Sequence, residues 1–75
     1  MTQSAIMNAF IKEIDRIRRE RGLNQQQLAD LLGTKQGNVS RLLRGEENPT
    51  IERCEEIAAK LGLEIRVQIV ELQSV

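Results

Sequence analysis

Residues 25–44 read QQQLADLLGTKQGNVSRLLR, and the small and apolar residues in this stretch are spaced for two short helices that cross. Ala29 is small, as a close approach of two helices requires. Gly33 is placed to end the first helix, because glycine adopts a left-handed backbone at the least cost. The inward positions follow helical spacing on both halves: Leu28 and Leu32 on the first, Val39 and Leu42 on the second.

The outward face of the second helix is polar and basic. It carries Gly37, Ser40, Arg41 and Arg44, with Lys35, Gln36 and Asn38 near its leading tip. Such side chains donate hydrogen bonds to phosphates and to the edges of bases. The stretch therefore predicts a DNA-binding helix-turn-helix, and the alternative is an ordinary helical hairpin with a glycine turn.

Length and composition exclude several other classes of protein. The 75 residues suffice for one domain, and a single phenylalanine is the only aromatic residue, so the core must be aliphatic. Without Tyr or Trp to stack on bases, a binder of single strands or RNA loops is disfavoured. The chain also has no His, no glycine-rich phosphate loop and little length for a pocket, so we do not expect an enzyme.

Cysteine and hydropathy patterns bear on redox chemistry, metals and membranes. Cys54 is the single cysteine and histidine is absent, so neither an internal disulfide nor a zinc site is expected, and we expect no cofactor. No apolar run reaches the ~18 residues of a membrane span. The first ten residues, MTQSAIMNAF, lack the basic region of a signal peptide. These features predict a soluble cytoplasmic protein without a membrane partner.

The formal net charge is zero, but the charges are separated along the chain. Residues 1–45 hold eight Lys and Arg against four Asp and Glu, whereas residues 46–75 hold three against seven. The part that contains the predicted motif is therefore basic and the remainder is acidic. Because the field at a binding face matters more than the total charge, this distribution still fits a DNA-binding protein.

A long amphipathic helix is predicted to precede the motif, over residues 4–21. Thr2 or Ser4 can cap its start, and Asn24 can cap the helix that follows over residues 25–32. The inward stripe of the long helix is predicted to be Ile6, Met7, Phe10, Ile11, Ile14 and Ile17.

A fourth helix is predicted over residues 51–61, after a turn at residues 45–49. Pro49 excludes a continuous helix through the turn, and Thr50 can cap the new helix. Its predicted inward stripe is Ile51, Cys54, Ile57, Ala58 and Leu61. Cys54 is therefore interpreted as a small core residue and not as a reactive thiol.

After Gly62 the period changes, because residues 63–69 alternate apolar and polar side chains. A lone strand leaves its backbone groups unpaired, and its simplest partner is the same strand of a second copy across a two-fold axis. A frayed tail and a helix extension are the alternatives. We therefore predict one domain over residues 1–75, with a helical part over 1–62 and a dimerisation strand over 63–71. The residues expected to pair the dimer are Leu63, Ile65, Val67 and Ile69.

Over residues 21–65 the chain resembles the Cro/C1-type helix-turn-helix family, also called Xre-like regulators. The matching positions are Leu23, Gln25, Leu28, Ala29, Gly33, Val39, Ser40, Gly45, Asn48-Pro49-Thr50 and Leu61-Gly62. The resemblance implies an all-α, lambda-repressor-like bundle of four to five helices that binds double-stranded DNA. The predicted C-terminal strand looks like that of HipB-type antitoxins, which pairs across a dimer.

The resemblance also implies roles for individual side chains. Gln25 would contact a phosphate and brace the recognition helix, while Gln36 and Arg41 would meet base edges. A glutamine can pair with adenine and an arginine with guanine. The phosphate contacts are assigned to Lys35, Asn38, Ser40 and Arg44.

The chain departs from the family pattern in its recognition helix and in the turn beyond it. Gly37 occupies a position where family members often place a reading side chain, which puts a base contact there in doubt. Glu46 and Glu47 lie in a turn that tends to be basic in phage repressors, so we expect its backbone contact to be lost.

The basic run RIRRER at residues 16–21 has two interpretations. Its cations suit the end of a helix dipole, or else Arg18 or Arg19 reaches the DNA backbone. The family often pairs an arginine at the position of Arg18 with an acidic residue at the position of Leu43. Because this chain has leucine there, the resemblance leaves Arg18 available for a phosphate.

Two functions fit these features. The first is a homodimeric, sequence-specific repressor that occludes a promoter at a near-palindromic operator. The alternative is an antitoxin, which binds a toxin protein through an acidic patch and regulates its own operon. The residues of this patch are Glu52, Glu55 and Glu56, which also fit a solvated helix face.

Overall fold

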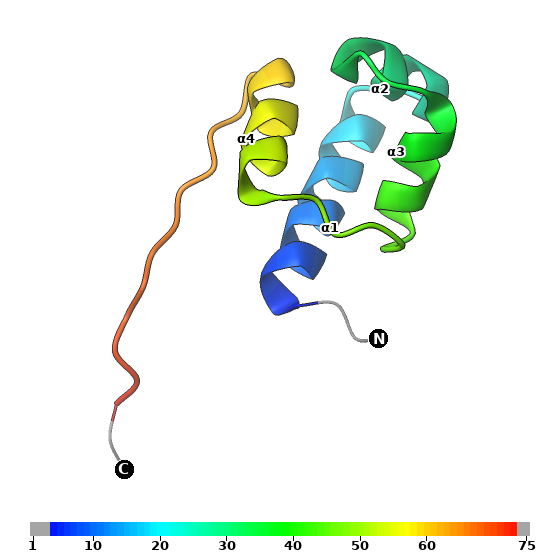
Figure 1. Ribbon diagram of the computed structural model, residues 1–75. Helices are drawn as coiled ribbons and strands as arrows, with labels where there is room; N and C mark the ends of the chain where they lie inside the picture. The colour runs from blue at the N-terminus through cyan, green and yellow to red at the C-terminus, as the bar shows by residue number, and fades with distance from the viewer. Residues whose placement is uncertain (1–3, 74–75) are drawn as a thin grey trace.

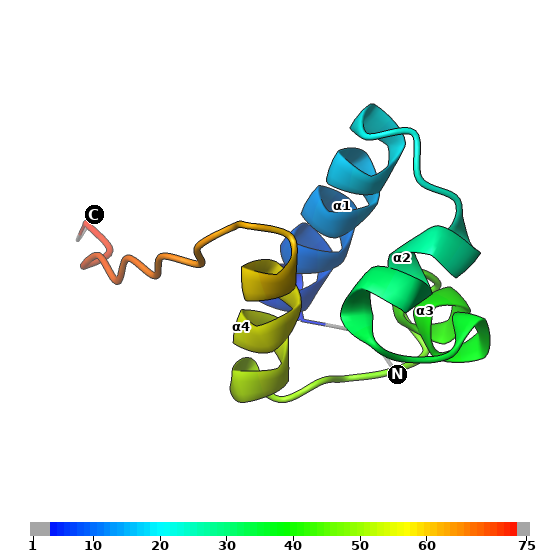
Figure 2. The same ribbon diagram turned by 90° about the horizontal axis from the view of Figure 1, so that it is seen from above.

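The computed structural model describes residues 4–73 and contains four helices within that range. They are α1 (Ala5–Glu20), α2 (Gln25–Leu32), α3 (Gln36–Leu43) and α4 (Ile51–Lys60). Helix α3 contacts α1 and α2, and α4 contacts α2, so the four helices enclose one core (Figures 1 and 2). This arrangement confirms an all-helical fold with two short consecutive helices, as the sequence predicted.

Local sequence signals set the helix boundaries. The left-handed backbone of Gly33, with φ of 69°, ends α2 as predicted. Asn24 forms a capping box in which its own backbone N–H donates to Gln27 Oε1 at 2.9 Å. Three helices begin with a side chain that accepts from the backbone N three residues on: Ser4 from Met7 (3.1 Å), Asn24 from Gln27 (2.7 Å) and Thr50 from Arg53 (3.0 Å).

The core is aliphatic, and all four helices contribute to it. Its members are Ile11, Ile14, Leu28, Ala29, Leu32, Val39, Leu42, Ile57 and Leu61. Cys54 is also buried, which confirms that it is a core residue, and this burial raises the pKa of its thiol.

Two predicted core residues are exposed instead. Ile6 is 81% exposed and Ile51 is 78% exposed, so the inward stripes were predicted one turn too long at these helix starts. Both residues lie in the first turn of their helices. Helical periodicity identifies the apolar face of a helix, but it does not say how much of that face the neighbouring helices cover.

An unpredicted contact joins α4 to the end of α2. The ammonium of Lys60 donates to the carbonyl of Leu32 at 2.9 Å and lies beside Gly33. A cation at a helix C-terminus satisfies an orphan carbonyl and interacts favourably with the helix dipole. Lys60 therefore fixes α4 against the turn that precedes α3.

The predicted C-terminal strand is absent from this single chain. Residues 63–73 have no regular secondary structure, and they extend away from the bundle (Figures 1 and 2). Leu63 is half-buried against the bundle core of its own chain, whereas Val67 and Ile69 are 78% and 92% exposed. One chain offers this segment no second strand, so its backbone groups have no ladder to join.

Within residues 4–73, no helix is long and apolar enough to cross a membrane.

Candidate nucleic-acid interface

The α2–α3 pair is a tightly packed unit. Leu28 and Ala29 of α2 are fully buried, and Val39 of α3 is 1% exposed. The turn between the helices is closed by Thr34, whose backbone N donates to the carbonyl of Ala29 at 2.9 Å. These contacts hold α3 rigidly against α2, so the outward face of α3 is a fixed surface.

The predicted site residues lie on that outward face or at its edge. Lys35 is the N-cap residue of α3 and makes no capping hydrogen bond, and Gln36 is the first residue of the helix. Both are exposed, as are Arg41 and Arg44. The half-buried members of the set are Gln25, Asn38 and Ser40. Helical spacing places Ser40, Arg41 and the C-cap residue Arg44 on the side of α3 away from the buried Val39 and Leu42.

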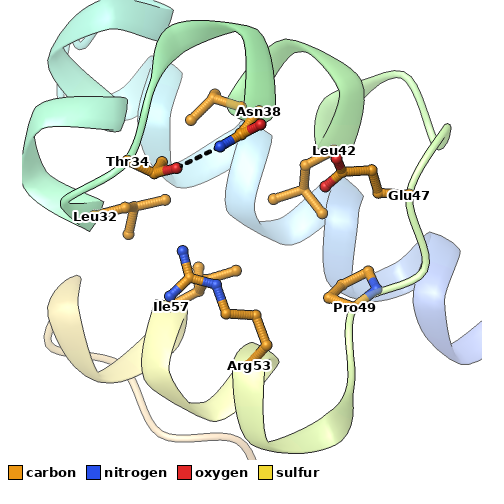
Figure 3. Close-up of a pocket in the computed structure, with 9 residues that line it drawn as sticks. Leu32, Thr34, Asn38, Leu42, Glu47, Pro49, Arg53 and Ile57 are labelled. Atoms are coloured by element: carbon orange, nitrogen blue, oxygen red, sulfur yellow. Dashed lines mark hydrogen bonds between the residues drawn. The ribbon is translucent and has the colours of Figure 1, made fainter.

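Arg41 is held in place by two neighbouring side chains. Its Nε donates to Oε1 of Glu47 at 3.0 Å, and its Nη2 donates to Oδ1 of Asn38. Asn38 in turn donates through Nδ2 to Oγ1 of Thr34 at 2.7 Å (Figure 3). A chain of hydrogen bonds therefore runs from the turn before α3, across the helix, to the loop after it.

Arg44 has a similar partner in the same loop. Its Nε donates to Oε2 of Glu46 at 2.8 Å, and both side chains are more than half exposed. Sequence reasoning treated Glu46 and Glu47 only as a lost backbone contact and missed that each pairs with an arginine of the motif. The signal was two acidic residues directly after RLLRG, but the path of the loop decides which arginine each one meets.

Arg18 is paired within the chain, whereas the family resemblance left it available for a phosphate. Its Nε donates to Oδ1 of Asp15 at 3.0 Å, and its Nη1 donates to the carbonyl of Leu23 at 2.8 Å. Only 19% of its side chain is exposed. Arg18 therefore joins the end of α1 to the segment before α2, and Asp15 takes the place of the acid that is missing at Leu43.

The other arginines of the basic run are largely paired as well. Arg16 forms ion pairs with Glu13 and with Glu20, and its Nη1 lies 2.7 Å from Oε2 of Glu20. Nε of Arg19 lies 3.3 Å from Oδ2 of Asp15. The hydrogen bond from Arg16 lowers the pKa of the Glu13 carboxyl and raises the pKa of the guanidinium. These pairs reduce the positive field that α1 adds to the α3 face. By contrast, no ion pair involving Lys35 occurs within residues 4–73.

A small pocket lies between α3, the following loop and α4 (Figure 3). Its volume is about 40 Å³, which is room for a few water molecules. Asn38, Glu47 and Arg53 line it together with apolar side chains. Within residues 4–73, no cluster of His, Cys, Asp or Glu side chains is suited to hold a metal ion.

Comparison with known families identifies the same part of the chain. A helix-turn-helix family model matches residues 14–68, which include α2, α3 and α4 in full. The chain belongs to the Cro/C1-type helix-turn-helix family. Family membership confirms the resemblance that the motif indicated and excludes the alternative of an ordinary helical hairpin.

Two relatives carry a name that states a function. The chain is 37% identical over 60 residues to an uncharacterized HTH-type transcriptional regulator of Haemophilus influenzae, covering 80% of the chain and 61% of the relative. It is 42% identical over 48 residues to another protein of that description from Sinorhizobium fredii, covering 64% of the chain and 62% of the relative. The alignments thus span about three fifths of each relative.

Proposed function

We propose that this family member binds double-stranded DNA through α3 and regulates transcription, as a homodimeric repressor at a near-palindromic operator. The observation that carries the proposal is the exposed row of donors on α3, which is held rigidly by the buried crossing of α2 and α3. The family and the names of both relatives favour a DNA-binding regulator over an enzyme.

The side chains divide into readers and anchors. Gln36 and Arg41 point outward from α3 and would meet base edges in the major groove. Gln25, at the start of α2, would donate to a phosphate and carry affinity without base preference. Further phosphate contacts fall to Lys35, Asn38, Ser40 and Arg44.

The C-terminal segment supports the dimer. Ile65, Val67 and Ile69 alternate with polar residues, and their side chains are exposed in the single chain. Exposed β-branched residues in an extended segment favour pairing with an identical segment across a two-fold axis. In such a dimer the two copies of α3 would enter successive major grooves, about 34–36 Å apart.

The antitoxin alternative gains no specific support. The carboxylates assigned to a toxin, Glu52, Glu55 and Glu56, lie on the exposed face of α4, and Glu56 lies 3.5 Å from Arg53. A solvated helix face with acidic residues near its start has the same appearance. A toxin partner therefore stays a prediction from the sequence.

The decisive experiment is selection of bound sequences from a random duplex pool, followed by binding measurements at stated salt concentrations. We expect an enriched site with two inverted halves one helical turn apart. The absence of any enriched sequence would contradict sequence-specific binding, and a single unrepeated half-site would contradict the dimer.

A further inference from the structure

Glu47 lies in the loop after α3 (Figure 3), and its carboxylate accepts a hydrogen bond from Arg41 of that helix. We propose that Glu47 is a positioning residue for Arg41: together with Asn38 it fixes the guanidinium beside Gly37 and so sharpens the base preference of Arg41. This inference rests on the proposed function, in which Arg41 meets a base edge.

The guanidinium is held from two sides by groups attached to different parts of the fold. Glu47 accepts from Nε of Arg41 at 3.0 Å, and Asn38 accepts from Nη2. Asn38 is half-buried and is itself fixed by its 2.7 Å bond to Thr34. Because one acceptor comes from the loop and the other from α3, rotation of the guanidinium would break at least one bond.

The guanidinium of Arg41 lies beside Gly37, at a distance where a methyl group would make an ordinary contact. A Cβ atom built at Gly37 would lie 3.7 Å from Nη1 of Arg41, so the guanidinium reaches back over the helix by one turn. Nε and Nη2 of Arg41 thus have fixed acceptors. The third nitrogen, Nη1, lies beside Gly37, at the position where family members often carry a side chain that contacts a base. Arg41 therefore takes the place on the surface that Gly37 leaves open.

Fixing the guanidinium matters because discrimination between bases depends on direction. A long arginine side chain that moves freely can donate to a phosphate as well as to a base, and phosphates are the same at every step. A side chain whose rotamer is already held by its neighbours also loses less freedom on binding. Loss of Glu47 should therefore reduce base preference more than it reduces affinity.

Three variants separate this role from a simple effect of charge. Glu47→Ala removes the acceptor, whereas Glu47→Gln removes the charge but keeps an oxygen that can accept from Arg41. Glu46→Ala is the matched control, because it removes one negative charge from the same loop but its partner is Arg44. Glu46 is exposed and Glu47 is half-buried, so all three variants should retain the fold.

Each variant is measured against a panel of single-base changes in the selected operator, beside Arg41→Ala. At the base pair that Arg41→Ala flattens, Glu47→Ala should lower discrimination by about two- to fivefold, the range of a surface carboxylate contact. Glu47→Gln and Glu46→Ala should keep discrimination at that base pair. In the free protein, Glu47→Ala should shift the Nε–H resonance of Arg41, whereas Glu46→Ala should leave that resonance unchanged.

The outcomes separate the inference from the proposed function. If Arg41→Ala flattens a base pair but Glu47→Ala does not, the positioning role is wrong and the proposed function stands. Equal loss in Glu46→Ala and Glu47→Ala would also overturn it, because charge alone would then explain both. If Arg41→Ala flattens no base pair, the reading role of Arg41 fails, and the inference fails with it.

Discussion

Replacing Lys35 with Gln should change the salt dependence of DNA binding by an amount that the structure allows us to calculate. Lys35 lies at the leading end of α3, is exposed and, within residues 4–73, has no ion pair that would compete with a phosphate. Each phosphate neutralised contributes about 0.9 to the slope of log affinity against log salt. A dimer carries two copies of Lys35, so the slope should become shallower by about 1.8.

The change is large enough for a routine assay. When salt rises from 50 to 200 mM, both proteins lose affinity. A slope difference of about 1.8 makes the fold-loss of the variant about twelve times smaller than that of the parent protein. Fluorescence anisotropy with a labelled duplex at four or five salt concentrations measures both slopes. The matched control is Arg16→Gln, which also removes one exposed positive charge but from a guanidinium that already binds Glu13 and Glu20.

The two variants together test the reasoning. If Lys35→Gln leaves the slope unchanged, or if Arg16→Gln reduces it as much, then ion pairing within the chain does not decide which cations meet phosphates. A change of about 0.9 instead of 1.8 would mean that one subunit occupies each site, which contradicts the dimer.

Three further predictions follow from the same structure. Gln36→Ala and Arg41→Ala should each cost about 1–3 kcal/mol at the preferred site and flatten one or two base pairs, whereas Gln25→Ala should weaken all sequences alike; a base preference altered by Gln25→Ala alone would reverse these roles. Val67→Pro removes a backbone donor and should shift sedimentation toward the monomer, so an unchanged dimer would contradict strand pairing. Lys60→Met should lower the free energy of unfolding by about 1 kcal/mol in urea titrations, because the last carbonyl of α2 loses its donor; unchanged unfolding would show that the contact adds nothing.

Much of the bundle could be predicted from residues that act on their immediate neighbours. Gly33 ended α2 where expected, and Asn24 and Thr50 capped their helices, because a cap needs only the backbone three residues on. The small side chain of Ala29 likewise indicated the close crossing of α2 and α3, and it is fully buried there. Spacing and capping are local, so the sequence by itself determined the helices, their inward faces and the family.

Other features depended on where distant segments meet, and only the tertiary structure decided them. The exposure of Ile6 and Ile51 depends on how far each helix extends beyond its neighbours, which periodicity does not encode. The contact of Lys60 with the end of α2 joins residues 28 positions apart.

The partner of Arg41 also depended on the path of the chain, because the loop after α3 brings the carboxylate of Glu47 within hydrogen-bond distance. Arg18 instead meets Asp15 three residues earlier on the same helix, which helical spacing alone allows. The conformation of residues 63–73 depends on more than one chain. A strand needs a second strand to pair with, and a single copy of the chain does not offer one. Residue types and spacing thus determined most of the helix faces, whereas the path of the loop after α3 decided that Glu47 meets Arg41 and that Glu46 meets Arg44.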